Sequence, residues 1–148
     1  MGVFNEKKII MEKRILKYSL LAGAVYFILV ATAHQIGIKV PVLFVYFNVP
    51  SQYYQDQIIS FMAFGWAVFL FSAFLNPANK ELVRAVLIAG FGAIFGLSII
   101  NLKTDFKILS SEINVSYFWA ETIGLLFYVL WLAYFYSRIN KDKRWKIL

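Results

Sequence analysis

The chain has 148 residues, of which 61% are hydrophobic and 16% are charged, with a net charge of +7 and no cysteine. Soluble domains contain roughly 45–50% apolar and roughly 25% charged residues, so this composition excludes an ordinary soluble domain. Without cysteine, the chain has no disulfide, no thiolate metal ligand and no thiol redox chemistry.

Residues 1–17 form a basic N-terminal segment, which carries Lys7, Lys8, Lys13, Arg14 and Lys17. Its apolar residues fall between these charges at near-helical spacing, which favours a helical lead-in lying near the membrane interface. An extension of the first membrane span is the alternative. The first apolar run itself, residues 18–34, ends at His34, the only histidine of the chain.

Residues 36–54 are too apolar for an exposed loop, because valine and aromatic residues fill most of the stretch between Pro41 and Pro50. We expect this segment to lie against the mouth of a helix bundle or to dip into the outer leaflet. Its composition favours an extended or hairpin conformation. Pro41 as a first helical residue and Pro50 as a stop also allow a short helix. Ser51 is the expected N-cap of the next helix.

Three further apolar runs follow, at residues 52–75, 82–102 and 115–136. All four runs fall within the range of about 17–25 residues that cross the hydrocarbon of a bilayer as a helix. Pro77 in the short segment Asn76–Asn79 forbids a continuous helix there, so the second and third runs are predicted to form a tight antiparallel hairpin. Residues 137–148 form a basic tail in which Trp145 suits the headgroup zone.

The placement of basic residues predicts the orientation of these helices. Most Lys and Arg residues lie in residues 1–17, around the hairpin turn and in the tail, whereas the other two loops hold only Lys39, Lys103 and Lys107. By the positive-inside rule, both termini face the cytoplasm. The sequence therefore predicts an all-α protein of the plasma membrane. We expect a single domain over residues 1–148, an antiparallel bundle of four transmembrane helices with residues 36–54 as its apolar external segment.

The same basic residues bear on the partners of the chain. Their position beside the apolar runs suits attraction to anionic membrane lipids. No soluble module presents them together with base-contacting polar and aromatic residues, so nucleic-acid binding is not expected.

Stripes of small residues predict which helix faces meet, because helices in lipid pack through Gly, Ala and Ser. In the third run this stripe contains Gly92 and Gly96, which we expect to allow close approach of a neighbouring helix. Each of the four stripes ends, on the external side, in an ionisable residue, and these are His34, Asp56, Lys103 and Glu121. If the stripes face inward, the four converge in a polar pocket that opens outward. The polar residues expected near them are Gln35, Tyr53, Gln57, Asn101 and Tyr117.

Glu121 is the strongest of these candidates, because it lies about 9 Å inside the fourth run if that run begins at Val115. Ionisable groups at membrane depth are costly and tend to be functional, although a first-turn carboxylate favoured by the helix dipole is the alternative. For Asp56 and Lys103 the alternative is a solvated helix end. We expect His34 to hydrogen-bond to a carboxylate, since a single histidine without cysteine disfavours a zinc site. No cofactor motif is present, so neither a cofactor nor a metal is predicted.

Two functions fit these features. In the first, a small non-catalytic membrane subunit or scaffold binds a lipophilic ligand, such as a lipid or quinone, or a membrane-protein partner through the aromatic segment and the polar pocket. In the second, Glu121, His34 and Asp56 act as acid and base groups of a membrane enzyme or proton-coupled carrier with a lipophilic substrate. The absence of a catalytic motif and of paired repeats favours the first.

Overall fold

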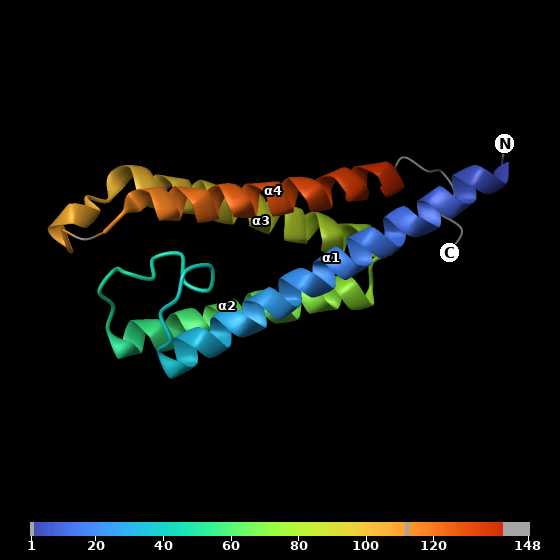
Figure 1. Ribbon diagram of the computed structural model, residues 1–148. Coiled ribbons are helices and arrows are strands. Elements are labelled where there is room, and N and C mark those ends of the chain that lie inside the picture. Colours follow the sequence, from blue (N-terminus) through green and yellow to red (C-terminus); the bar gives the residue numbers. More distant parts are fainter. Residues whose placement is uncertain (1, 112, 141–148) are drawn as a thin grey trace.

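The computed structural model describes residues 2–111 and 113–140, with side chains from residue 8 onward. It contains four long helices and one short 3-10 helix (Figure 1). Their bounds are α1 Gly2–Ile36, α2 Tyr53–Leu75, α3 Lys80–Lys103, η1 Phe106–Ile108 and α4 Val115–Asn140. All four long helices are long and apolar enough to cross a membrane, which confirms the predicted all-helical membrane class. Residues 141–148, including Trp145, lie outside the described residues.

α1 is one unbroken helix that includes both the basic N-terminal segment and the first apolar run. Of the two predictions, this agrees with the extension of the first span. No proline lies in this stretch to end the helix earlier. The helix ends at Gly37, whose φ of 75° lies in the left-handed region that favours glycine. The N–H groups of Gly37 and Ile38 bind the carbonyl oxygens of His34 and Ala33, at 3.3 and 2.9 Å. This Schellman motif directs the chain away from the helix axis.

An N-cap at Ser51 predicts that α2 begins at residue 52, but the helix begins at Tyr53. Its N-cap is Gln52, whose backbone N–H donates to the side-chain oxygen of Gln55 at 3.2 Å. The prediction of Ser51 as the N-cap is therefore wrong. The hydroxyl of Ser51 donates instead to the carboxylate of Asp56, so it is already committed to a side chain of the first turn of α2.

The long helices form two antiparallel pairs, α1 with α2 and α3 with α4 (Figure 1). The α1–α2 interface is the most extensive and the α2–α3 interface is the smallest of those formed by neighbouring helices. The beginning of α1, the end of α4 and the α2–α3 turn lie at one end, which we call the terminal end. Residues 37–52 and the segment that joins α3 to α4 lie at the other, the loop end. The two pairs diverge toward the loop end.

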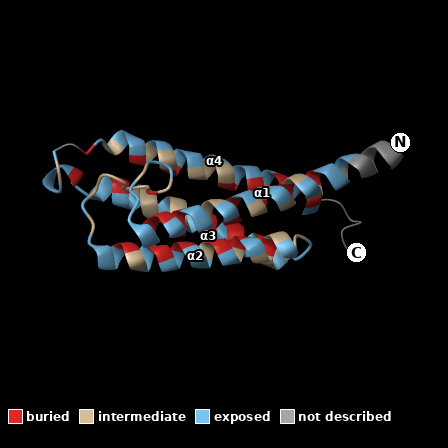
Figure 2. Ribbon diagram, turned by 60° about the horizontal axis from the view of Figure 1, so that its bottom comes forward, coloured by how far each residue is buried: buried red, intermediate tan, exposed pale blue. Residues whose placement is uncertain are grey.

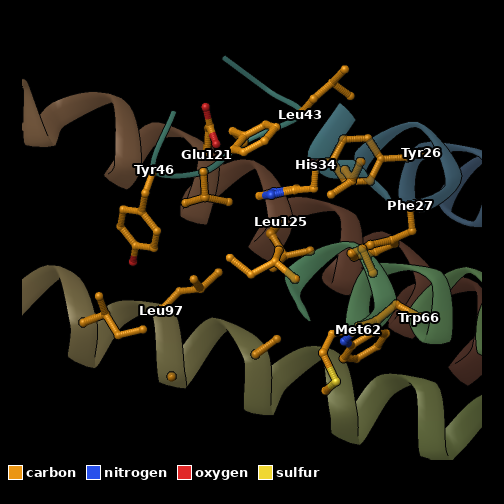
Figure 3. Close-up of a pocket in the computed structure, with 18 of the residues that line it drawn as sticks. Tyr26, Phe27, His34, Leu43, Tyr46, Met62, Trp66, Leu97, Glu121 and Leu125 are labelled. Atoms are coloured by element: carbon orange, nitrogen blue, oxygen red, sulfur yellow. The ribbon is translucent and has the colours of Figure 1, made fainter. Parts of the chain in front are cut away.

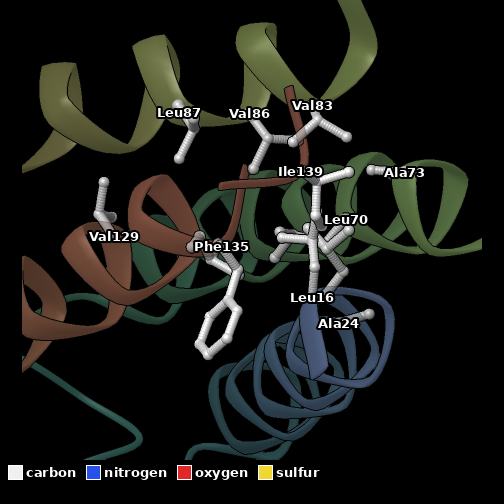
Figure 4. Packing of buried hydrophobic residues seen from close by; sticks show 12 residues of the cluster. Leu16, Ala24, Leu70, Ala73, Val83, Val86, Leu87, Val129, Phe135 and Ile139 are labelled. Atoms are coloured by element: carbon white, nitrogen blue, oxygen red, sulfur yellow. The ribbon is translucent and has the colours of Figure 1, made fainter. Parts of the chain in front are cut away.

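Buried apolar residues differ in arrangement between the two ends. Near the terminal end, one cluster draws side chains from all four long helices (Figure 4). Its members include Leu16, Leu20, Leu70, Val83, Leu132 and Phe135. Toward the loop end there are two smaller clusters, one between α1 and α2 around Val30 and one around Phe106 and Phe118. The outward faces of the helices are largely exposed (Figure 2), as expected of helices that meet lipid.

Small residues mark the contact faces of some helices and not of others. On α2, the small residues Ser60, Ala63 and Ala67 are buried, which agrees with the rule that small residues mark a contact face. On α3 the predicted close approach at Gly92 and Gly96 is wrong, because a Cβ added at either would meet nothing within 4 Å. The close approach occurs at Gly90, where an added Cβ would lie 2.8 Å from a methyl carbon of Val129 on α4. Gly90 shares a helix face with the buried residues of α3, and Gly92 and Gly96 do not.

Candidate functional site: a cavity beneath the 37–52 loop

Residues 37–52 lie between the two helix pairs where the pairs diverge (Figure 1). The segment is a series of turns, so neither the expected hairpin nor the expected short helix is present. Two turns are closed by backbone hydrogen bonds, from Phe44 to Val40 at 3.1 Å and from Val49 to Tyr46 at 3.0 Å. Phe44 packs on His34 of α1 and Tyr46 packs on Phe118 of α4, so the segment contacts both helix pairs.

Val42 connects this loop to both helix pairs through its backbone. The hydroxyl of Tyr26 on α1 donates to the Val42 carbonyl oxygen at 2.5 Å. The Val42 N–H donates to Oε1 of Glu121 on α4 at 3.0 Å. Val42 has a φ of 73°, in the left-handed region that a β-branched residue rarely adopts. This conformation costs about 1–2 kcal/mol, which the two hydrogen bonds offset.

Tyr46 connects the loop to the α3–α4 pair by a buried polar network. Its hydroxyl donates to Oδ1 of Asn101 at 2.9 Å, and the amide nitrogen of Asn101 donates to the hydroxyl of Thr122 at 3.2 Å. Asn101 and Thr122 are both buried. The Tyr46 ring also packs against Phe106 and Phe118, with centroid distances of 5.5 and 4.8 Å. Burial raises the pKa of Tyr46 to about 12, so the phenol stays protonated and keeps its role as donor.

A cavity of about 690 Å³ lies beneath the loop and between the helix pairs (Figure 3). All four long helices and the loop line it. Along α3 its lining residues run from Val86 to Ile100, a length of about 21 Å at about 1.5 Å per residue. Most of the lining side chains are apolar, and the ionisable ones, His34, Asp56 and Glu121, come from the parts of their helices nearest the loop end.

His34 and Asp56 form a buried pair at the loop end of the cavity. Nδ1 of His34 lies 3.5 Å from Oδ1 of Asp56, a close polar contact without hydrogen-bond geometry. Ser51 donates to both oxygens of Asp56 at 3.0 Å, and Lys39 donates to Ser51 at 2.5 Å. The imidazole stacks on the ring of Phe44, with centroids 3.4 Å apart. A line of polar groups thus runs from the exposed Lys39 to the buried His34.

The burial of the candidate carboxyl groups differs from the prediction. Asp56 is 6% exposed, so its alternative interpretation as a solvated helix end is wrong. Glu121 is only half-buried, yet its Oε2 atom is inaccessible and has no hydrogen-bond partner among the described residues. The structure therefore brings His34, Asp56 and Glu121 to one cavity, with Glu121 on the opposite helix pair from the other two.

The remaining predicted residues do not line the cavity. Lys103 is exposed at the end of α3. Gln35 accepts hydrogen bonds from Gln57 and Ser60 and so ties α1 to α2. Tyr53 is 72% exposed and Tyr117 54% exposed. Asn101 is buried outside the cavity lining, where its side-chain oxygen accepts the hydrogen bond from the Tyr46 hydroxyl.

Several residues at this site have no counterpart in the sequence prediction. Tyr26 and Tyr46 hold the loop, Phe44 covers His34, and Trp66 lines the cavity. One signal could have indicated the tyrosines, because a tyrosine within an apolar run needs a partner for its hydroxyl. That reasoning also applies to Tyr128, whose hydroxyl donates to the carbonyl oxygen of Ser19 at 2.9 Å.

The donor set of the site suits an organic ligand better than an ion. Within residues 2–111 and 113–140, no group of three or more His, Asp or Glu side chains could hold a metal ion. The site is instead an elongated apolar space with a few polar groups at one end, the usual composition of a small-molecule site. Comparison of the chain with protein-family models, with curated proteins and with solved structures finds no match.

Proposed function

We propose that this chain is a non-catalytic membrane subunit or scaffold that binds a lipophilic ligand in the cavity beneath residues 37–52. The observation that carries the proposal is a cavity of about 690 Å³ between helices that are apolar enough to cross a membrane. Its volume falls within the roughly 300–1,000 Å³ of small-molecule sites. Direct helix packing leaves few voids larger than a water molecule, so a space of this size supports binding rather than loose packing.

The wall between α2 and α3 supports access from the lipid. Among neighbouring helices, these two share the smallest interface. Met62 of α2 lines the cavity and is 60% exposed. Gly96 of α3 also lines the cavity, and no atom lies within 4 Å of where its Cβ would be. A lipophilic molecule could therefore pass between α2 and α3 without first crossing water.

The orientation of the chain is part of the proposal. We infer that both termini are cytoplasmic and that the loop end faces outward from the plasma membrane, because the basic residues concentrate at the terminal end. A reporter fused after Asn79 should be cytoplasmic, and one fused after Lys107 should be external. The reverse pattern would invert the orientation and place the cavity mouth inside the cell.

Filling the cavity tests the binding proposal. Gly96→Phe places a ring in the open space of the cavity, whereas Gly92→Phe is a matched control on the same helix, with open surroundings but outside the cavity lining. Native mass spectrometry of gently extracted protein should show a lipophilic molecule retained by the wild type and by Gly92→Phe, and lost from Gly96→Phe. Equal retention by all three proteins, or by none, would contradict binding in this cavity.

The His34–Asp56 pair favours a second candidate, an enzyme or proton-coupled carrier with a lipophilic substrate. A histidine beside a carboxylate is a common arrangement for a general base, and here Asp56 is linked through Ser51 to the exposed Lys39. An inactive His34→Gln variant of an enzyme would retain substrate where the wild type retains product. Different retained masses in the two proteins would favour catalysis, and identical masses would favour the binding role.

A further inference from the structure

The polar groups that line the cavity can be sorted by whether their hydrogen bonds are already made. No Lys or Arg lines the cavity in the described part of the chain, whereas Asp56 and Glu121 both do. The hydroxyls of Tyr26, Tyr46 and Tyr128 all donate to protein oxygens. The three lining tyrosines are therefore not free donors for a ligand.

His34 presents an acceptor to the cavity. It is 6% exposed, and Nδ1 faces the Asp56 carboxylate at 3.5 Å. A carboxylate beside Nδ1 favours the tautomer that carries its proton there, which leaves the lone pair on Nε2. Figure 3 shows the His34 ring projecting from α1 into the cavity. The nitrogen that Asp56 does not engage is thus a hydrogen-bond acceptor.

Glu121 places a second carboxylate at the cavity, from the helix pair opposite Asp56. Its Oε1 atom is occupied by the Val42 N–H, and its Oε2 atom is buried without a partner among the described residues. Neither oxygen is therefore open to a ligand hydroxyl. A ligand with a negative charge would meet the carboxylates of Asp56 and Glu121, since the ammonium of Lys39 lies outside the cavity lining and is bound to Ser51.

We propose, building on the binding function above, that the ligand is a long-chain alcohol whose neutral hydroxyl donates to Nε2 of His34. Its single apolar tail would lie along the roughly 21 Å of cavity between α2 and α3, beside Trp66 and Leu97. An anionic headgroup is disfavoured by Asp56 and Glu121.

Fluorescence of Trp66 provides the measurement. The full chain is placed in nanodiscs with an alcohol that is brominated along its tail, which should quench Trp66 on binding. Unlabelled hexadecan-1-ol, its methyl ether and hexadecyl phosphate then compete at equal mole fractions in the lipid. The three competitors share one tail and differ in donor capacity and charge. A Trp66→Phe protein identifies the part of the signal that comes from the cavity.

We expect the alcohol to compete about tenfold better than the ether and the phosphate, because one buried acceptor is satisfied only by the alcohol. In His34→Phe, which keeps a ring against Phe44, the preference over the ether should fall by several-fold. Glu81→Gln is the control, since Glu81 is exposed near the terminal end.

Each other outcome has a distinct meaning. Equal competition by alcohol and ether would overturn the hydroxyl assignment and leave cavity binding intact. Stronger competition by the phosphate would overturn the neutral headgroup. If no tail-brominated probe quenches Trp66, while Trp66→Phe confirms that Trp66 contributes to the emission, both this inference and the proposed binding function are contradicted.

Discussion

The four helices pack differently at the two ends of this molecule. At the terminal end, side chains from α1, α2, α3 and α4 meet in one cluster. At the loop end, the helix pairs diverge, the buried clusters are divided between them, and residues 37–52 occupy the mouth of the gap. Helices in lipid associate through close packing and hydrogen bonds rather than through exclusion from water. The comparison indicates that packing holds the terminal end and hydrogen bonds through the loop hold the loop end.

The polar contacts of the two ends support this difference. The loop end has the Tyr26–Val42–Glu121 and Tyr46–Asn101–Thr122 hydrogen bonds, both of which join a loop residue to helices. The terminal end has a buried carboxylate too, but Glu12 is paired directly with Arg138 of α4, at 2.8 Å. No unpartnered buried side-chain oxygen or nitrogen is found there among the described residues. Among the described residues, buried side-chain atoms without a hydrogen-bond partner are therefore found at the loop end.

The largest expected effect comes from removing packing at the terminal end. Leu20 is fully buried in the four-helix cluster, so Leu20→Ala should lower the free energy of unfolding by about 2–5 kcal/mol. Leu97→Ala removes the same atoms from the wall of the cavity and should cost less than about 1 kcal/mol. Circular dichroism during denaturation in mixed micelles measures both. A larger loss in Leu97→Ala would show that the loop end is as tightly packed as the terminal end.

A smaller effect is expected from removing a hydrogen bond at the loop end. Tyr46→Phe leaves the Asn101 oxygen without its donor and should cost about 1–2 kcal/mol at neutral pH. Because burial raises the Tyr46 pKa to about 12, the folded state holds this proton more tightly than the unfolded state, whose pKa is about 10. The stabilisation is complete below pH about 10 and is lost as the pH rises toward about 12.

The Tyr46 pH dependence has its own measurement. Between about pH 10 and about pH 12, the wild type should lose stability faster than Tyr46→Phe, as measured by thermal unfolding at each pH. Parallel loss of stability in the two proteins would mean that Tyr46 is solvated and does not hold the loop.

The smallest expected effect is a gain. Val42 has the only positive φ among the described non-glycine residues. Val42→Gly removes the backbone strain of this conformation, and the strain is somewhat larger than the entropy cost of glycine, so the variant should be more stable by about 0.5 kcal/mol. Val45→Gly, where φ is ordinary, should destabilise it by about 0.5–1 kcal/mol. Thermal unfolding of both variants compares them. A clear loss of stability in Val42→Gly would mean that the Val42 side chain itself anchors the loop.

The sequence predicts the terminal end better than the loop end, for physical reasons. Length and apolar content are enough to identify four membrane-crossing helices, and the small residues of α2 predict its contact face. On α3 the same rule fails, because glycines occur on two faces and only Gly90 opposes another helix. Small size permits close approach but does not say which neighbour approaches.

The loop is the part that the sequence does not predict. Its valines favour extended structure, yet Val42 adopts a left-handed conformation because Tyr26 and Glu121 bind both of its backbone groups. Those partners lie far from Val42 in sequence and on different helices. For the candidate site, the stripe argument names His34, Asp56 and Glu121, which line one cavity, but it also includes Lys103, which is exposed beyond the cavity.

The length of α1 has a consequence for the surroundings of the protein. Its 35 residues extend for about 52 Å at about 1.5 Å per residue. Even at a tilt of about 40°, near the upper limit for such helices, it reaches about 40 Å along the bilayer normal, against roughly 27–33 Å of hydrocarbon in cellular membranes. An α1 that crosses any of these bilayers therefore extends beyond the hydrocarbon at one end, whereas the 23-residue α2 is about 34 Å long, close to the thickness of the hydrocarbon.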